Sequence, residues 1–297
     1  MTLLVALVCA GAVGSAVWYR ARPLSNVAMF KRMSPQDSII LSIDFGTLRR
    51  SGILQRLVGS KSVEDADYQR FVKEIGFDYK EQLDSAMVGF APNGKFMFLR
   101  GDFDWPKLRA YAKQQGGMCR IDGCRMTGST PDRQISFLPV QKNVIALAVS
   151  PTLEASLLTT RAGGPDPEIP RAPVWLWVPG SALKSGGNLP SGTRSFTRSI
   201  EYADHVILTL GVEDERFTAK MEVQCVTEFE AAEVVSQLKQ ATATLRQMIE
   251  RENLLPNPGD LSGVLASGTF YTQGLKAIGH WWIEDAFIDN VWSGGVN

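Results

Sequence analysis

The sequence is poor in the side chains on which most enzymes and metalloproteins depend. Its 297 residues include two histidines and four cysteines. The G-x-S-x-G, H-E-x-x-H, P-loop and dinucleotide-binding G-x-G-x-x-G motifs are absent. The sequence therefore predicts no metal site and no cofactor, and it carries no recognisable catalytic signature.

Net charge is missing as well. Thirty-one Lys and Arg residues balance 31 Asp and Glu residues, which gives a formal net charge of zero at pH 7. A nucleic-acid-binding protein needs a basic excess to displace counterions, so we expect no nucleic-acid partner. At 44% hydrophobic and 21% charged residues, the composition is globular and excludes disordered, collagen-like and disulfide-scaffold proteins.

The groups that could perform acid–base chemistry are scattered along the chain. His205 and His280 are the only histidines, and Asp102 and Asp104 flank Phe103 ahead of a predicted helix that Asp104 caps. A hydrolase-type enzyme assembled from these dispersed groups is one hypothesis. The preferred hypothesis is a binding or structural module whose function depends on its surfaces.

The most informative segment is an uncharged run of 17 residues, Leu3 to Tyr19, closed by Arg20 and Arg22. This length just reaches the minimum for a helix that crosses a bilayer, so we expect a single-pass anchor with the lipid bilayer as partner. A cleaved signal peptide is the alternative, since Gly14 and Ala16 have the spacing that a signal peptidase accepts. Residues 21–37 then form a juxtamembrane link.

Two arguments about membrane sidedness disagree. The basic residues after the apolar run favour a cytoplasmic location for the globular part. Against this, Cys119 and Cys124 flank the turn signal Asp122-Gly123, and a four-residue loop would place the two cysteines opposite each other, close to disulfide range. Because a stable disulfide requires an oxidising compartment, we expect the globular part outside the cytoplasm. Two reduced cysteines packed in a hairpin are the alternative.

Hydrophobic periodicity and turn signals predict an α+β fold with mostly antiparallel sheets and packed helices. A stretch rich in proline and glycine, 162–173, separates a first lobe, 38–161, from a second, 174–292. A strand meander that leads into a capped helix occurs in both lobes, which suggests a weak internal repeat. The predicted strands are 38–45, 85–91, 95–100, 134–140, 143–149, 174–178, 195–202, 206–212 and 217–226. The predicted helices are 48–58, 64–75, one capped by Asp104, a short one after Ser150-Pro151, one opened by Thr227 and 284–291, with 263–283 extended.

The last part of the chain is enriched in aromatic residues. Trp281 and Trp282 fall on opposite faces of a predicted strand, so at least one of them needs cover. Trp281, Trp282 and Trp292 are candidates for a surface that binds a protein partner, because large aromatic residues are enriched in interfaces. Packing beneath the helix 284–291 is the alternative.

Several short stretches follow the predicted anchor in a characteristic order. They are Asp44-Phe-Gly-Thr-Leu-Arg-Arg-Ser-Gly-Ile-Leu, Gly76-Phe-Asp-Tyr, Gly101-Asp-Phe-Asp-Trp, Cys124-Arg-Met-Thr-Gly-Ser and Gly279-His-Trp. This layout resembles that of bacterial membrane-anchored proteins of a domain family of unknown function. The resemblance covers nearly all of the chain after the anchor. It implies a membrane location and no known activity or catalytic residue.

Overall fold

In a computed structural model of the chain, the residues described here are 23–58, 66–128, 130, 133–160, 167–184, 200, 203–213, 216–252 and 255–293. The predicted anchor Leu3–Tyr19, most of the predicted strand 195–202 and the first part of the linker 162–173 lie outside them. Among the helices that are described, none combines the length and hydrophobicity needed to span a membrane.

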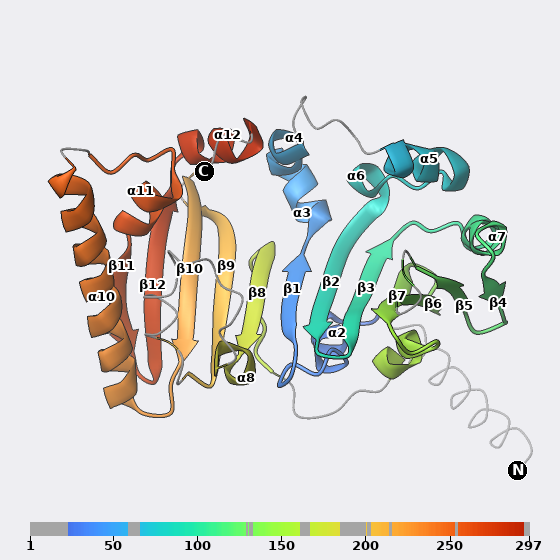
Figure 1. The fold of residues 1–297 in the computed structure, drawn as a ribbon, viewed down its shortest axis with the longest axis horizontal. Helices are drawn as coiled ribbons and strands as arrows, with labels where there is room; N and C mark the ends of the chain where they lie inside the picture. The colour runs from blue at the N-terminus through green and yellow to red at the C-terminus, as the bar shows by residue number, and fades with distance from the viewer. Residues whose placement is uncertain are drawn as a thin grey trace, which may run out of the picture.

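In the described part of the chain, twelve strands form one continuous antiparallel sheet, with helices packed against it (Figure 1). The α+β class is thereby confirmed, although the strands of both predicted lobes join in one sheet rather than in separate ones. The strand order is β11-β12-β10-β9-β8-β1-β2-β3-β7-β6-β5-β4. The strands are β1 Ile39–Ile43, β2 Leu83–Ala91, β3 Gly94–Gly101, β4 Met118–Cys119, β5 Cys124–Thr127, β6 Gln134–Gln141, β7 Val144–Ser150, β8 Val174–Pro179, β9 His205–Glu213, β10 Arg216–Gln224, β11 Thr269–Gln273 and β12 Lys276–Ile283.

The helices lie mainly along the ends and flanks of the sheet (Figure 1). They are α2 Asn26–Lys31, α3 Phe45–Arg50, α4 Ile53–Val58, α5 Ala66–Ile75, α6 Tyr79–Gln82, α7 Trp105–Gln114, the 3-10 helix η1 Ala155–Thr160, α8 Gly180–Lys184, α10 Glu228–Arg251, α11 Leu261–Ala266 and α12 Asp285–Ser293.

The two parts of the chain connect their strands and helices in the same order. In the first, β1 leads through helices to the hairpin β2–β3, then α7 and later the hairpin β6–β7, giving the spatial order β1-β2-β3-β7-β6. In the second, β8 leads through α8 to the hairpin β9–β10, then α10 and the hairpin β11–β12, giving β8-β9-β10-β12-β11. The two sets meet where β1 pairs with β8.

Alternating side chains give the sheet two faces with different cover. One face, which we call the α10 face, packs against α10 at one end and α7 at the other. The opposite face, which we call the α2 face, packs against α2 in the first part of the chain. There Phe30 is fully buried and contacts Trp175 and Trp177 of β8, with ring centroids 5.8 and 5.1 Å apart. Because α2 precedes β1, this contact ties the N-terminal side of the described chain to its second part.

Local signals explain most helix ends. The Thr227 hydroxyl accepts from the Glu230 amide and the Glu230 carboxylate accepts from the Thr227 amide, so the predicted capping box begins α10. The predicted helix 48–58 is instead two helices, because Gly52 has a φ of +72° between α3 and α4 and interrupts them. The predicted extended region 263–283 was wrong at its start, where α11 is capped by Asp260.

Candidate functional site

The residues proposed for acid–base chemistry do not come together. His205 and His280 are two strand spacings apart across the sheet and four residues apart along the strand direction, which together correspond to about 16 Å. Asp102 and Asp104 follow β3, which lies four strands from β9, or about 19 Å. The Asp104 carboxylate accepts from the Lys107 amide and caps α7. Within the described ranges, no three His, Cys, Asp or Glu side chains are grouped as a metal site would require.

The candidate partner residues at the end of the chain have different surroundings. Trp281 is only 7% exposed, because it faces α10 and packs edge-on against Phe270 at 5.4 Å between centroids. Trp282 lies on the α2 face, where the Arg216 guanidinium sits 5.6 Å from its ring centroid. Trp281 therefore belongs to the core. The side chain of Trp292, in α12, lies outside the described part.

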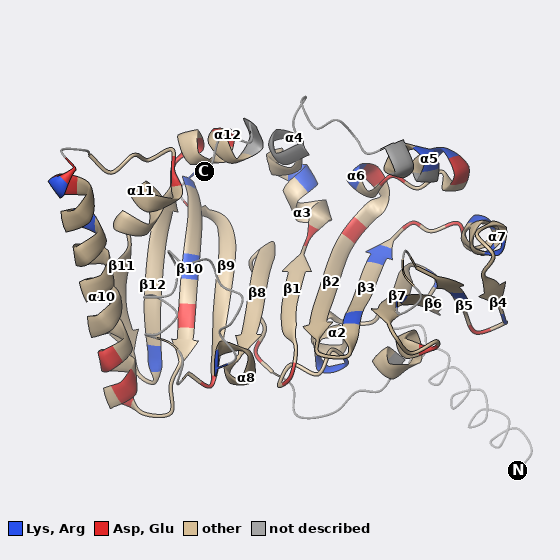
Figure 2. Cartoon of the chain, viewed as in Figure 1, with Lys and Arg blue, Asp and Glu red and all other residues tan. Residues whose placement is uncertain are grey.

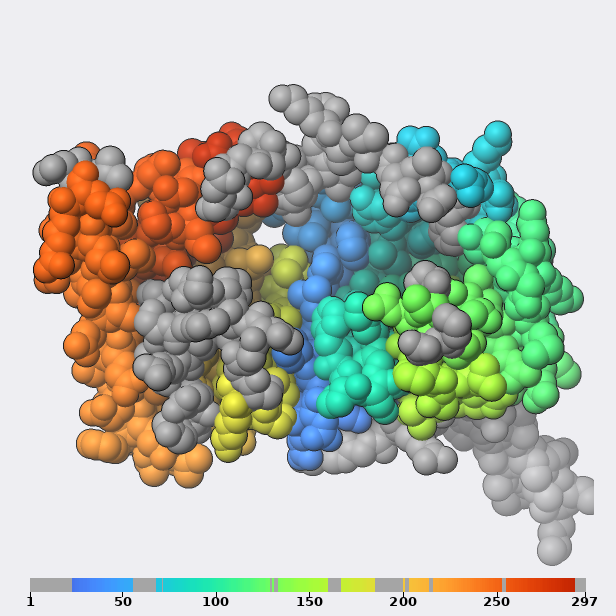
Figure 3. Space-filling view, in the orientation of Figure 1, coloured from blue at the N-terminus to red at the C-terminus, as the bar shows by residue number. Residues whose placement is uncertain are grey.

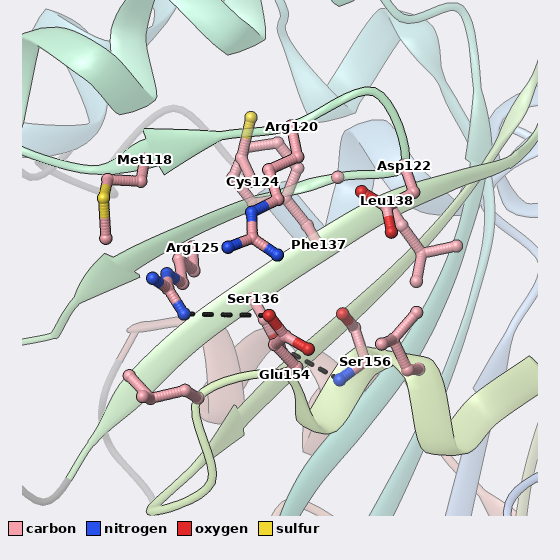
Figure 4. Close-up of a pocket in the computed structure, with 13 residues that line it drawn as sticks. Met118, Arg120, Asp122, Cys124, Arg125, Ser136, Phe137, Leu138, Glu154 and Ser156 are labelled. Atoms are coloured by element: carbon pink, nitrogen blue, oxygen red, sulfur yellow. Dashed lines mark hydrogen bonds and ion pairs between the residues drawn. The ribbon is translucent and has the colours of Figure 1, made fainter.

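The disulfide predicted from the hairpin is present. Cys119 and Cys124 pair directly across β4 and β5 through the four-residue loop, and they are bonded. A pocket of about 40 Å³ lies beside this hairpin (Figure 4), where Arg125 pairs with Glu154 at 3.7 Å and the Ser156 amide donates to the Ser136 hydroxyl. This volume holds a few water molecules at most, so the pocket is too small for an organic ligand.

A larger pocket, open to solvent on one side, lies on the α10 face and has a volume of about 210 Å³. Four separate parts of the chain surround it: α3 and α4, the start of β8, the ends of the neighbouring strands β9, β10 and β12, and helix α12. Figure 3 shows an opening in the molecular surface at this place, between α12 and α3. The lining residues are Leu48, Ile53, Pro173, Val174, Leu210, Gly211, Phe217, Thr218, Ile283, Phe287, Ile288 and Val291. Thr218 is the only one of the twelve with a polar side chain, so the pocket is an apolar site.

Strand lengths explain why this space is open. Val174, the first residue of β8, pairs with Leu210, whereas β9 continues to Glu213. The last residues of β9 therefore extend beyond β8 and leave a notch between β9 and α3. Helix α12 closes the outer side, held by a hydrogen bond of 2.8 Å from the Asn290 amide group to the Gly259 carbonyl. The apolar side chains that α12 turns inward border the pocket.

From the pocket, an apolar surface continues across the middle of the α10 face. Six side chains in register, one from each of six adjacent strands, form a row that we call the apolar strip. Among the described residues neither α7 nor α10 buries it: Leu208 is 37% exposed and the other five members are partly exposed. The central strands β8 and β1 carry no charged residue (Figure 2). The strip consists of Leu208, Leu176, Leu41, Val88, Met97 and Leu147.

Charged groups gather instead on the α2 face of the second part of the chain. Lys220 bonds to Glu213, and His280 Nε2 lies 3.6 Å from the same carboxylate. Lys276 pairs with Glu222 at 2.9 Å. The hydrogen bond from Lys220 lowers the pKa of the Glu213 carboxyl, although partial desolvation acts in the opposite direction. These pairs neutralise one another on an open surface.

Sequence reasoning missed the pocket and the strip. The pocket residues run from Leu48 to Val291, so no local motif contains them. A signal did exist for the strip, because β8 is apolar on both faces and β1 is too except at Ser42, and such strands need cover on two sides.

Comparisons with known proteins give structural likenesses alone. No family model and no curated protein matches the chain. Crystal structures of TP0453 in crystal forms I, III and IV resemble it with sequence identities of 10%, 9% and 10% and TM-scores of 0.44, 0.47 and 0.45. The likenesses cover 91%, 89% and 92% of this chain and 98%, 97% and 96% of TP0453.

Proposed function

We propose that this chain is a binding module that holds an apolar ligand in the pocket between α3, α4, α12 and the sheet. The observation that carries the proposal is the pocket itself, with about 210 Å³ of space and an almost wholly apolar lining. An engineered apolar cavity of about 150 Å³ binds benzene, so an apolar pocket of about 210 Å³ has room for a small hydrocarbon. Ligand pockets of this kind are lined mainly by hydrophobic side chains.

We further propose that the module works outside the cytoplasm, tethered to a membrane by Leu3–Tyr19. Two features support this location. The run itself is uncharged and 17 residues long, and the Cys119–Cys124 disulfide suits an oxidising compartment. An apolar ligand would then be taken up in the compartment that borders the membrane.

Filling the pocket tests the binding proposal. Leu210 borders the pocket and is 46% exposed, so the larger indole of Leu210→Trp can enter the open space without overpacking the core. Titration of the purified chain with octanol, followed by calorimetry, should show saturable binding. The variant should lose at least tenfold in affinity while keeping its unfolding temperature.

Leu261→Trp is the matched control, because Leu261 is a leucine of equal exposure, 45%, in α11 outside the pocket. It should bind octanol as the unmodified chain does. Equal octanol affinity in Leu210→Trp and Leu261→Trp, or no saturable binding by the unmodified chain, would refute the pocket as a binding site.

A further inference from the structure

We propose that the ligand is a long single-chain fatty acid, which lies across the sheet with its tail end in the pocket, its hydrocarbon chain along the apolar strip and its carboxylate at Lys95. This inference rests on the proposed function and specifies the ligand class. It is carried by three observations: the continuity of pocket and strip, the position of one cation, and the distance between the two ends.

Pocket and strip are one continuous surface. Leu210 and Val174 border the pocket and pair with each other across β9 and β8. Two residues further along the same strands and on the same face, Leu208 and Leu176 begin the strip. A hydrocarbon chain that leaves the pocket therefore meets apolar side chains without interruption.

The strip is a single row of side chains, which suits one hydrocarbon chain. It is closed at one end by Met221 beneath α10 and at the other by Phe137 beneath α7, both less than 9% exposed. Between these ends, six apolar side chains remain partly exposed. Contiguous apolar surface that remains partly exposed marks ligand or partner sites, because it is costly to leave in water.

Among the described side chains of the rows that contain and flank the strip, one is a cation. Three rows of side chains cross β9 to β7 on the α10 face, and of their eighteen residues only Lys95 is charged. Lys95 lies two residues from Met97 on the same face, with its ammonium 5.9 Å from the centroid of the Phe90 ring. Its exposed ammonium can pair with a carboxylate at the edge of the apolar surface, which favours an anionic amphiphile over a neutral hydrocarbon.

The distance between the two ends suits a whole acyl chain. Leu210 and Lys95 are separated by four strand spacings and two rows of side chains, which corresponds to about 23 Å. An acyl chain spans about 15 Å in one leaflet of a bilayer, half of the hydrocarbon core. A long chain with its tail end in the pocket therefore covers most of this separation, and the long side chain of Lys95 can extend toward its carboxylate, whereas a short chain ends well before Lys95.

Chain-length dependence is the test. The purified chain is titrated with octanoate, dodecanoate and palmitate at concentrations below micelle formation. If the strip holds the chain, each added methylene should strengthen binding, up to about fourfold. Palmitate should bind at least tenfold more tightly than dodecanoate.

Two variants remove parts of this site and leave the pocket intact. Met97→Gln makes the strip more polar at nearly constant length, and Lys95→Gln removes the cation. Each should weaken palmitate at least fivefold and leave octanol unchanged. The controls are Leu158→Gln, at an exposed leucine of η1, and Lys142→Gln, at an exposed lysine of the β6–β7 turn; both should bind palmitate normally.

The outcomes separate this inference from the proposed function. Octanol binding with palmitate no tighter than octanoate would overturn the strip and leave the pocket in place. If neither Met97→Gln nor Lys95→Gln changed the affinity for palmitate, the strip would also be overturned as the binding site of the acyl chain. Absence of binding by any probe would overturn both proposals.

Discussion

Two glycines show how differently single methyl groups would act in this structure. A Cβ at Gly268 would lie 2.5 Å from Trp281 Nε1 and 2.8 Å from Phe270 Cζ, inside the core beneath α10. A Cβ at Gly211 would have Pro173 Cδ as its nearest neighbour, at 4.0 Å. Neither glycine has a positive φ, so packing alone distinguishes the two sites.

We expect Gly268→Ala to lower the free energy of unfolding by about 1–3 kcal/mol, because the new methyl overpacks the Trp281 site. Gly211→Ala should raise it by about 0.5–1 kcal/mol, since a mid-strand glycine is entropically unfavourable relative to alanine. Urea denaturation of the two variants measures both changes. If Gly268→Ala and Gly211→Ala had the same free energy of unfolding, Trp281 would not be packed tightly in the core.

At the scale of elements, the hairpin β4–β5 is the element whose turn and register the sequence predicted most accurately. Asp122-Gly123 identified the turn, and the choice of a four-residue loop gave the Cys119–Cys124 register that the structure has. Helix α11 shows the opposite case. Its six residues are too few to display helical periodicity, and apolar Val264 and Leu265 read equally well as strand.

The disulfide gives a prediction at this scale. Replacing Cys119 and Cys124 together by serine should cost about 2 kcal/mol of unfolding free energy, since the bond closes a short loop. The bond can be checked by denaturing the protein with an alkylating reagent and no reductant, followed by peptide mass spectrometry. Cys119 and Cys124 should be found linked. Cys225 should be alkylated, because it is a free thiol that denaturation exposes. Full alkylation of all three would remove the main support for a location outside the cytoplasm.

On the scale of the whole molecule, strand order could not be predicted, because it depends on pairings between distant parts of the chain. Ile40 pairs with Trp177 and Ile43 with Val174, across more than a hundred residues. Nothing local in β1 or β8 specifies that the two strands pair. The sequence alone therefore predicted two lobes and not one shared sheet. For the same reason the candidate site was not predicted: Leu48 and Val291 border one pocket only because this pairing brings their elements together.

The shared sheet predicts that the two predicted lobes unfold together. The β1–β8 pairing and the contact of Phe30 with Trp175 and Trp177 couple them. Tryptophan fluorescence and far-ultraviolet circular dichroism should therefore give coincident urea transitions. Two resolved transitions, or transitions that differ between the probes, would indicate separate domains joined by the linker 162–173.

The position of β1 at the centre of the sheet also has a consequence for synthesis. Its partner on one side, β2, follows within 40 residues, but its partner on the other side, β8, begins at Val174. At ordinary rates of translation, β1 waits on the order of ten seconds with one edge unpaired after β2 has emerged. An apolar strand with a free edge is a site for aggregation. The nascent chain therefore needs protection, by a chaperone or by its own later segments, until the second part of the sheet arrives.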